Sequence, residues 1–323
     1  MALKPLNLNH AAQIQAGTIG RNRGHDFEFK LADQTNKSHY PILASKLDSN
    51  IFHGDPTKTL LSYVTFYVGW KQCERAEAIA LGALATAEEG RRWLEINGVR
   101  VKACKSDILL NLRDRRGLTK TIGISVKQCN NKTPTNAQLY FTTAYAFCEL
   151  LRNNCINVSG DGEKSLRQFC GDSGYRPQDN PTVLVKRNTD PRRFFWEETS
   201  RKGRLELESI FSTHQDVITR LLLQKAYLND PFTPEILLHK TKKLSKNPQE
   251  YALYSIEELI MLSRKHKGFE KKKYSVKKGQ YKDPCGVFHE APRFGVVQMQ
   301  RGGQKQHPTQ LQFNLEAGYF YKI

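Results

Sequence analysis

The stretch SDILLNLRDRRGLTKTIGISVKQ (residues 106–128) predicts a β-hairpin. Its first arm, residues 107–112, is rich in Ile and Leu, and its second arm, residues 119–128, alternates apolar with polar side chains. A polar turn that contains Gly117 joins them, as expected where two strands reverse direction. We therefore expect these two antiparallel strands to form part of the central sheet.

Side chains alternate between the two faces of a strand, so Ser125 and Lys127 share one face while Ile124 and Val126 take the other. We expect the Ile124 face to lie against the core. Asp107 begins the neighbouring arm. An acid and an amine are therefore predicted at the same end of two adjacent strands.

This pairing suits the hydrolysis of a phosphodiester. Mg²⁺ prefers one or two carboxylates together with a carbonyl, waters and the substrate phosphate. Asp107 can supply a carboxylate, and Val126 can supply its backbone carbonyl. Lys127 can then orient or deprotonate the attacking water and offset charge on the phosphate.

The motif resembles that of the PD-(D/E)XK nuclease superfamily, in particular its type II restriction endonucleases. Their core is a strand with Asp followed by a strand with Glu-x-Lys or, in some members, Ser-x-Lys; here the match reads SDILL and then ISVKQ. The resemblance implies a Mg²⁺-dependent enzyme that cuts double-stranded DNA at a short recognition sequence. It also implies a homodimer on a palindromic site and a cognate DNA methyltransferase in the host.

Two positions depart from the family pattern. Ser106 replaces the motif's Pro, and Ser125 stands where a second acid is usual, so another carboxylate must complete the metal site. Glu28 lies on an amphipathic segment similar to the N-terminal helix of many restriction enzymes. Glu149 lies on an apolar segment after the hairpin, from which Ser-x-Lys members often draw a carboxylate. Both remain candidates.

Composition limits the class of partner. The chain has 323 residues with 50 Lys and Arg against 32 Asp and Glu, a net charge of +18, which favours a polyanion such as DNA. No apolar run approaches the roughly 20 residues that span a bilayer. The start lacks a signal-peptide core, and seven cysteines without a C-x-x-C pair argue against a zinc site or a disulfide framework. We therefore expect a soluble, cytoplasmic protein.

The order of elements predicts an α/β fold with a mixed central sheet flanked by helices, as in restriction endonucleases, followed by a basic α+β region. We expect a catalytic core over residues 1–230 and a DNA-binding region over residues 231–323. Besides the hairpin, the expected elements are helices over residues 25–36, 60–68, 70–97, 136–151 and 205–228, strands over 99–103 and 181–187, and a surface loop over 153–180.

The C-terminal region carries much of the charge. From Lys240 to Lys282 there are thirteen Lys or Arg against four acids, a net of +9 (13 − 4), and Ser255-Ile-Glu-Glu predicts a capped helix. Residues 294–300 and 310–315 predict a second hairpin that could enter a major groove; an ordinary solvated hairpin is the other interpretation. The candidate DNA contacts are Lys271, Lys272, Lys273, Lys277, Lys278, Arg301, Gln304, Lys305 and Gln306.

Two other functions fit parts of this pattern. A structure-selective or repair nuclease of the same superfamily would share the site without reading bases. A non-catalytic nucleic-acid-binding protein would share the charge but would not depend on Asp107.

Overall fold

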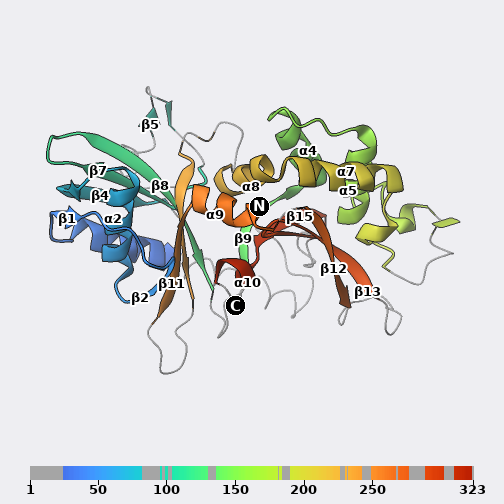
Figure 1. The fold of residues 1–323 in the computed structure, drawn as a ribbon. Coiled ribbons are helices and arrows are strands. Elements are labelled where there is room, and N and C mark those ends of the chain that lie inside the picture. Colours follow the sequence, from blue (N-terminus) through green and yellow to red (C-terminus); the bar gives the residue numbers. More distant parts are fainter. Residues whose placement is uncertain are drawn as a thin grey trace, which may run out of the picture. The chain divides into compact units, whose positions relative to one another are not determined.

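The computed structural model describes most of the chain in two compact units (Figure 1). The first unit takes residues 1–137, 223–259 and 320–323, and the second takes residues 138–222 and 260–319. The described residues are 25–81, 95–96, 99–100, 104–129, 136–180, 182–183, 190–225, 230, 232–241, 249–266, 268–275, 288–301 and 309–321.

The first unit is built on a six-stranded mixed sheet. Its strands run in the order β2 (Ile51–His53), β11 (Glu250–Ser255), β10 (Pro234–Lys240), β8 (Thr119–Gln128), β7 (Ile108–Arg113) and β4 (Arg75–Ala80). The β8–β10 pair is parallel, and every other described neighbouring pair is antiparallel. The α/β class and the mixed central sheet are confirmed.

The predicted hairpin is formed by β7 and β8, which pair from Ile108 opposite Ile124 to Arg113 opposite Thr119. Asp114 closes the turn by accepting hydrogen bonds from the backbone N–H groups of Arg116 (2.9 Å) and Leu118 (2.8 Å). Gly117 takes a φ of +82°, a left-handed conformation that glycine adopts without steric cost.

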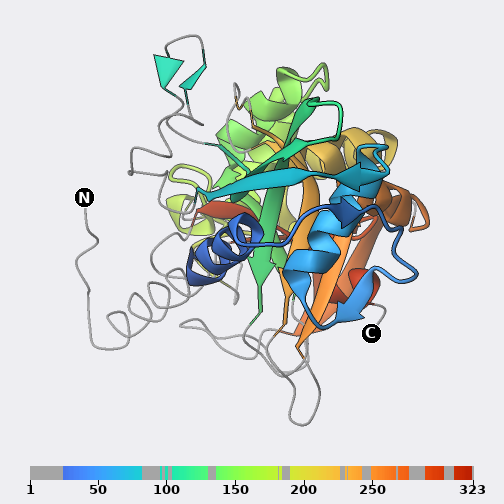
Figure 2. The same ribbon diagram turned by 90° about the vertical axis from the view of Figure 1, so that its left-hand side faces the viewer.

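Helices cover the apolar face of this sheet. The helix over residues 25–36 and α2 (Pro56–Tyr67) lie against it (Figures 1 and 2), and Phe27, Leu31, Leu60 and Val64 join one buried cluster. From β8, the residues in that cluster are Ile122, Ile124 and Val126. The predicted division of β8 into an apolar and a polar face is therefore confirmed.

One expected helix, residues 70–97, is wrong. Residues 75–80 form β4, whose side chains alternate in burial and pair with β7, and Gln72–Cys73 is the short strand β3 against β1 (Ile42–Leu43). The alanines and glutamates there favour a helix, but intrinsic propensity is a small energy per residue, and pairing with β7 overrides it. Residues 82–94 of the expected helix lie outside the described residues.

Smaller differences occur at the ends of elements. Asp55 caps α2: its carboxylate accepts from the N–H of Thr57 at 2.9 Å, and Pro56 takes the first helical position. The expected strand over 99–103 is described only as β6 (Val99–Arg100), which pairs with β5 (Glu95–Ile96). In the expected strand over 181–187, residues 182–183 are helical and the others lie outside the described residues; the neighbour of β8 is β10 instead.

The second unit contains a five-stranded sheet with helices. The sheet order is β12 (Phe269–Ser275), β13 (Phe288–Phe294), β14 (Val297–Arg301), β15 (Gln310–Leu315) and β9 (Ala137–Thr143). Further helices in the described part of the chain are α4 (Ala144–Arg152), α5 (Gly160–Cys170), η1 (Pro177–Asp179), η2 (Trp196–Glu198), α7 (Arg201–Thr213), α8 (Gln215–Gln224), α9 (Ile256–Arg264) and α10 (Ala317–Phe320).

Three expectations change in this part of the chain. The segment 136–151 is a strand before it becomes α4, and the expected helix over 205–228 is two helices that meet at His214. Residues 160–170, expected to be a surface loop, form α5, which Ser159 caps. A serine at this position stabilises a helix start whose interior looks turn-like. The second hairpin is confirmed as β14 and β15, although Phe294 belongs to β13.

The two units do not follow the boundary expected at residue 230. Strands β10 and β11 follow that residue in the sequence but pair into the sheet that holds β8. No described helix is long and apolar enough to cross a membrane. The six cysteines that the structure describes are all free thiols.

We predict that Ser255→Ala lowers the free energy of unfolding by about 1 kcal/mol, because it removes a helix cap. The hydroxyl of Ser255 accepts from the N–H of Glu258 at 3.1 Å, and the Glu258 carboxylate accepts from the N–H of Ser255 at 2.7 Å, which confirms the predicted capping box. Urea unfolding would measure the change. Ser45→Ala, at an exposed serine, is the control and should match the wild type; equal stability of all three proteins would contradict the prediction.

Candidate active site

Asp107 sits where β7 begins, and hydrogen bonds on both sides fix its backbone. Its N–H donates to the carbonyl of Ile124 on β8 at 2.8 Å, and its own carbonyl accepts from the N–H of Leu81, just after β4, at 2.8 Å. Pairing therefore continues through Asp107 from both neighbouring strands. The position of its Cα follows from the register of the hairpin.

The carboxylate of Asp107 is held through one of its two oxygens. Oδ2 accepts from the backbone N–H of Val126 at 2.6 Å, from the Ser125 hydroxyl at 3.2 Å and from the Lys127 ammonium at 3.2 Å. Within the described residues, no hydrogen-bond partner is observed for Oδ1. The strand that follows the turn thus orients the carboxylate and leaves its second oxygen available.

Ser125 occupies the position where a second acid was expected, and its contact shows what it does there. Its side chain is buried, and its hydroxyl donates to Asp107. A hydroxyl in this place orients the carboxylate and adds no negative charge. A second carboxylate for the site must come from another element.

Lys127 lies against both oxygen donors that the motif predicts for a metal. Its ammonium is 3.2 Å from Asp107 Oδ2 and 3.1 Å from the carbonyl oxygen of Val126. The Lys127 ammonium therefore offsets the negative charge of the Asp107 carboxylate. Both side chains are only partly buried. The predicted grouping of Asp107, Val126 and Lys127 is present in the structure.

Glu28 brings a second carboxylate to the same place from the helix over residues 25–36. It is 7% exposed, and burial, together with the negative charge of Asp107, raises its pKa to about 8, while Lys127 acts in the opposite direction. No described residue hydrogen-bonds its buried Oε2, and His25 Nδ1 lies 3.9 Å from that oxygen. A buried carboxylate oxygen without a donor is costly unless a proton or a cation accompanies it.

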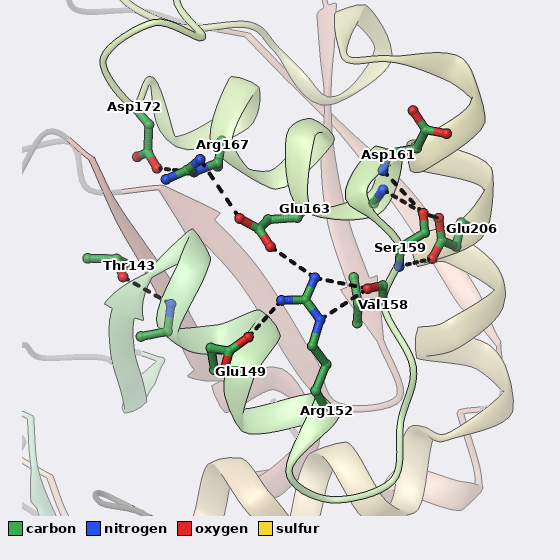
Figure 3. A network of polar contacts seen from close by, with 12 residues as sticks. Thr143, Glu149, Arg152, Val158, Ser159, Asp161, Glu163, Arg167, Asp172 and Glu206 are labelled. Atoms are coloured by element: carbon green, nitrogen blue, oxygen red, sulfur yellow. Dashed lines mark hydrogen bonds and ion pairs between the residues drawn. The ribbon is translucent and has the colours of Figure 1, made fainter.

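Glu149, the other candidate acid, lies on α4 in the second unit. Its carboxylate accepts from Arg152 at 2.7 Å, and Arg152 also donates to Glu163 at 2.9 Å and to the carbonyl of Val158 (Figure 3). This network links α4 to α5 within that unit. Glu149 is thus engaged by an arginine, whereas Glu28 has an unpaired oxygen among the described residues.

Two basic residues near this site were missed by the sequence analysis. The pKa of Lys105 is lowered to about 7, mainly by burial and also by the positive charge of Lys127, while the negative charges of Asp107 and Asp230 act in the opposite direction. His239 pairs in register with Lys127 across β8 and β10, and burial lowers its pKa to about 3, with Lys127 contributing. Lys105 stands two residues before Asp107, a spacing that could have revealed it; His239 depends on strand pairing that the sequence does not show.

Of the predicted DNA contacts, those that the structure describes lie on the second unit's sheet. Lys271 is exposed on β12 and forms ion pairs with Glu208 at 3.5 Å and Glu290 at 3.3 Å. The Arg301 guanidinium lies over the Phe195 ring and donates to the carbonyl of Phe194. Lys272 and Lys273 belong to β12, while Lys277, Lys278, Gln304, Lys305 and Gln306 lie outside the described residues. Their contacts with DNA stay predictions.

The donors of the first unit fit a hard divalent cation. Among the described residues, Glu28 Oε2 and Asp107 Oδ1 have no hydrogen-bond partner, and Val126 adds a carbonyl. Among the described residues, no group of three or more His, Cys, Asp and Glu side chains is placed to hold a metal. Two carboxylates with a carbonyl, waters and a substrate oxygen would match the coordination that Mg²⁺ prefers.

Comparisons with known proteins add little to this description. No protein-family model matches the chain, and no curated protein matches it. Among solved structures, restriction endonuclease MspI in complex with its cognate DNA is similar over 80% of this chain and 78% of that one, with 8% sequence identity and a TM-score of 0.44.

We predict that metal-free protein loses stability as the pH rises from about 5 to about 8, and that Glu28→Gln reduces this loss. The unfolded chain releases the Glu28 proton near pH 4.5, whereas the folded chain holds it until about pH 8. Between these values the folded state binds more protons, so the free energy of unfolding falls with pH, by up to about 1.4 kcal/mol per pH unit.

Urea unfolding at several pH values in EDTA would measure this slope. Glu149→Gln is the matched control and should keep the slope of the wild type. Identical slopes for Glu28→Gln and the wild type would contradict the prediction.

Proposed function

We propose that the protein is a type II restriction endonuclease that uses Mg²⁺ to hydrolyse double-stranded DNA at a short recognition sequence. The observation that carries this proposal is that Asp107, the Val126 carbonyl and Lys127 meet at one end of two adjacent strands, next to Glu28, a buried carboxylate with one oxygen that no described residue hydrogen-bonds. The net charge of +18 supports a polyanionic substrate.

Each residue would have a separate role. Glu28, Asp107 and the carbonyl of Val126 would hold the cation. When bound, Mg²⁺ polarises the phosphate and lowers the pKa of a coordinated water. Lys127 would orient the attacking water and offset the negative charge that develops on the phosphate. The water oxygen forms the new bond to phosphorus, one P–O ester bond breaks, and the leaving oxygen takes up a proton.

The ion pair between Lys127 and Asp107 has a consequence for this chemistry. The ammonium contacts the same two donors, Asp107 and the Val126 carbonyl, that would hold the cation. Lys127 and a cation would therefore compete for these oxygens, because two positive groups repel at such short range.

The remaining parts of the proposal follow from the resemblance in the motif. Homodimerisation on a palindromic site, a methyltransferase that protects the host and a cytoplasmic location belong to the type II endonucleases that SDILL and ISVKQ resemble. Digestion of a mapped genome with Mg²⁺, followed by sequencing of the ends, would report activity, recognition sequence and stagger together. A structure-selective nuclease would instead cut branched DNA and give no discrete fragments.

We predict that Asp107→Asn lowers the cleavage rate by at least about 100-fold, because an amide binds the cation poorly, while DNA binding is kept. Cleavage of plasmid DNA in Mg²⁺ and gel-shift binding in Ca²⁺ would measure the two effects. Asp114→Asn, at the other end of β7, is the control and should cut normally. If Asp107→Asn cuts as fast as the wild type, the site is wrongly assigned.

We also predict that the two candidate acids separate in the same assay. Glu28→Gln should reduce cleavage by about 10-fold or more and raise the Mg²⁺ concentration needed for half-maximal rate, because it removes a charged ligand. Glu149→Gln should cut at nearly the wild-type rate, since its carboxylate pairs with Arg152. The opposite ranking would assign the second carboxylate to Glu149.

A further inference from the structure

A clamp of hydrogen bonds holds the residues that lead into Asp107. Asp230 is 6% exposed, and its Oδ2 accepts from the backbone N–H of Lys105 at 2.5 Å. Its Oδ1 accepts from the backbone N–H of Phe232 at 3.0 Å. One buried carboxylate therefore ties the segment before β7 to the segment before β10.

A second bond strengthens the same connection. The hydroxyl of Ser106 donates to the carbonyl of Phe232, so two successive residues, Lys105 and Ser106, are each fixed to the chain around residues 230–232. Ser106 is 3% exposed, which protects this bond from competing water. The serine that replaces the motif's proline thus has a structural role that proline could not fill, because proline has no hydroxyl.

Gly123 on β8 makes room for the clamp. A Cβ added there would collide with the Ser106 hydroxyl and would come within 2.7 Å of the carbonyl of Thr233. The segments before β7 and β10 therefore pass over β8 in close contact. This close contact fixes where β7 and β10 begin on the two sides of β8, the strand that carries Lys127.

We propose that Asp230 is a positioning residue that holds the Lys105–Asp107 segment, so that the Asp107 carboxylate faces the Glu28 carboxylate at the distance a divalent cation requires. In this part the inference rests on the proposed function, because the cation belongs to it. Each oxygen of Asp230 accepts a backbone N–H group, so the role we assign to it is positioning and not contact with substrate or metal.

The substitution Asp230→Asn tests this role with little change of volume. An amide nitrogen cannot accept a hydrogen bond, so one of the two N–H groups of Lys105 and Phe232 loses its partner. Buried N–H groups without partners exchange their hydrogen faster or force the backbone to move. Asp114→Asn is the matched control, because Asp114 also accepts two backbone N–H groups beside β7, but in the turn at the strand's other end.

We predict that Asp230→Asn weakens the binding of Mn²⁺, used as the probe metal, by about 10-fold, and lowers the rate of DNA cleavage by about 10- to 100-fold. DNA binding in Ca²⁺ should stay as in the wild type. Isothermal titration would measure Mn²⁺ affinity, and hydrogen exchange would show faster exchange at Lys105 or Phe232. Asp114→Asn should leave Mn²⁺ affinity and cleavage unchanged.

Loss of stability alone is separated by two further variants. Ser255→Ala destabilises the same unit away from Asp107 and should keep the wild-type Mn²⁺ affinity. If Asp230→Asn does not fold, Ser106→Ala removes only the Ser106–Phe232 bond of the clamp and should weaken Mn²⁺ binding about 3-fold, as expected for the loss of one hydrogen bond. Wild-type Mn²⁺ affinity in the folded Asp230 variant, or in Ser106→Ala if that variant alone folds, overturns the inference.

Failure of the proposed function would look different. If the wild type binds Mn²⁺ but cuts no DNA, the nuclease proposal is overturned, and the Mn²⁺ affinities of wild type and variant still decide the role of Asp230. If the wild type cuts DNA and the Asp230 variant has the same Mn²⁺ affinity and cleavage rate, the proposed function stands and the role of Asp230 is overturned. A wild-type protein that binds no Mn²⁺ and cuts no DNA overturns both.

Discussion

The pairing of β7 with β8 is the constraint on which the site depends. Because of this pairing, the N–H of Asp107 donates to the carbonyl of Ile124, and the N–H of Val126 donates to the carboxylate of Asp107. Because β8 alternates, the same ten residues deliver an apolar face to the core and a polar face to the site. A slip of one residue would exchange these faces, so burial of the core also enforces the geometry of the chemistry.

Electrostatic strain is concentrated where two carboxylates and two amines converge. Glu28 is buried beside Asp107, and Lys127 lies between the carboxylate of Asp107 and a carbonyl. The raised pKa of Glu28 and the lowered pKa of Lys105 both express the cost of burying charge there. Shifts of this size are frequent at sites built to bind or transform a ligand.

Local sequence patterns predicted the elements whose signal is contained within a few residues. The hairpin, the helix over residues 25–36 and the capping box at Ser255 are examples, since alternation, amphipathicity and caps are local properties. The expected helix over residues 70–97 failed for the opposite reason. Alanine and glutamate are good helix formers, but intrinsic propensity amounts to less than about 1 kcal/mol per residue, and pairing of β4 with β7 supplied a larger, non-local gain.

The sequence by itself determined the candidate acid and amine on the hairpin, because their spacing and the alternation of β8 leave one arrangement of faces. Only the tertiary structure brought Glu28 to Asp107, placed His239 beside Lys127 and tied Asp230 to Lys105. These contacts join segments that are about 80 to 125 residues apart in the sequence; Lys105 and Asp230, for example, are separated by 125 residues. Their formation depends on packing and strand order, which no local pattern encodes.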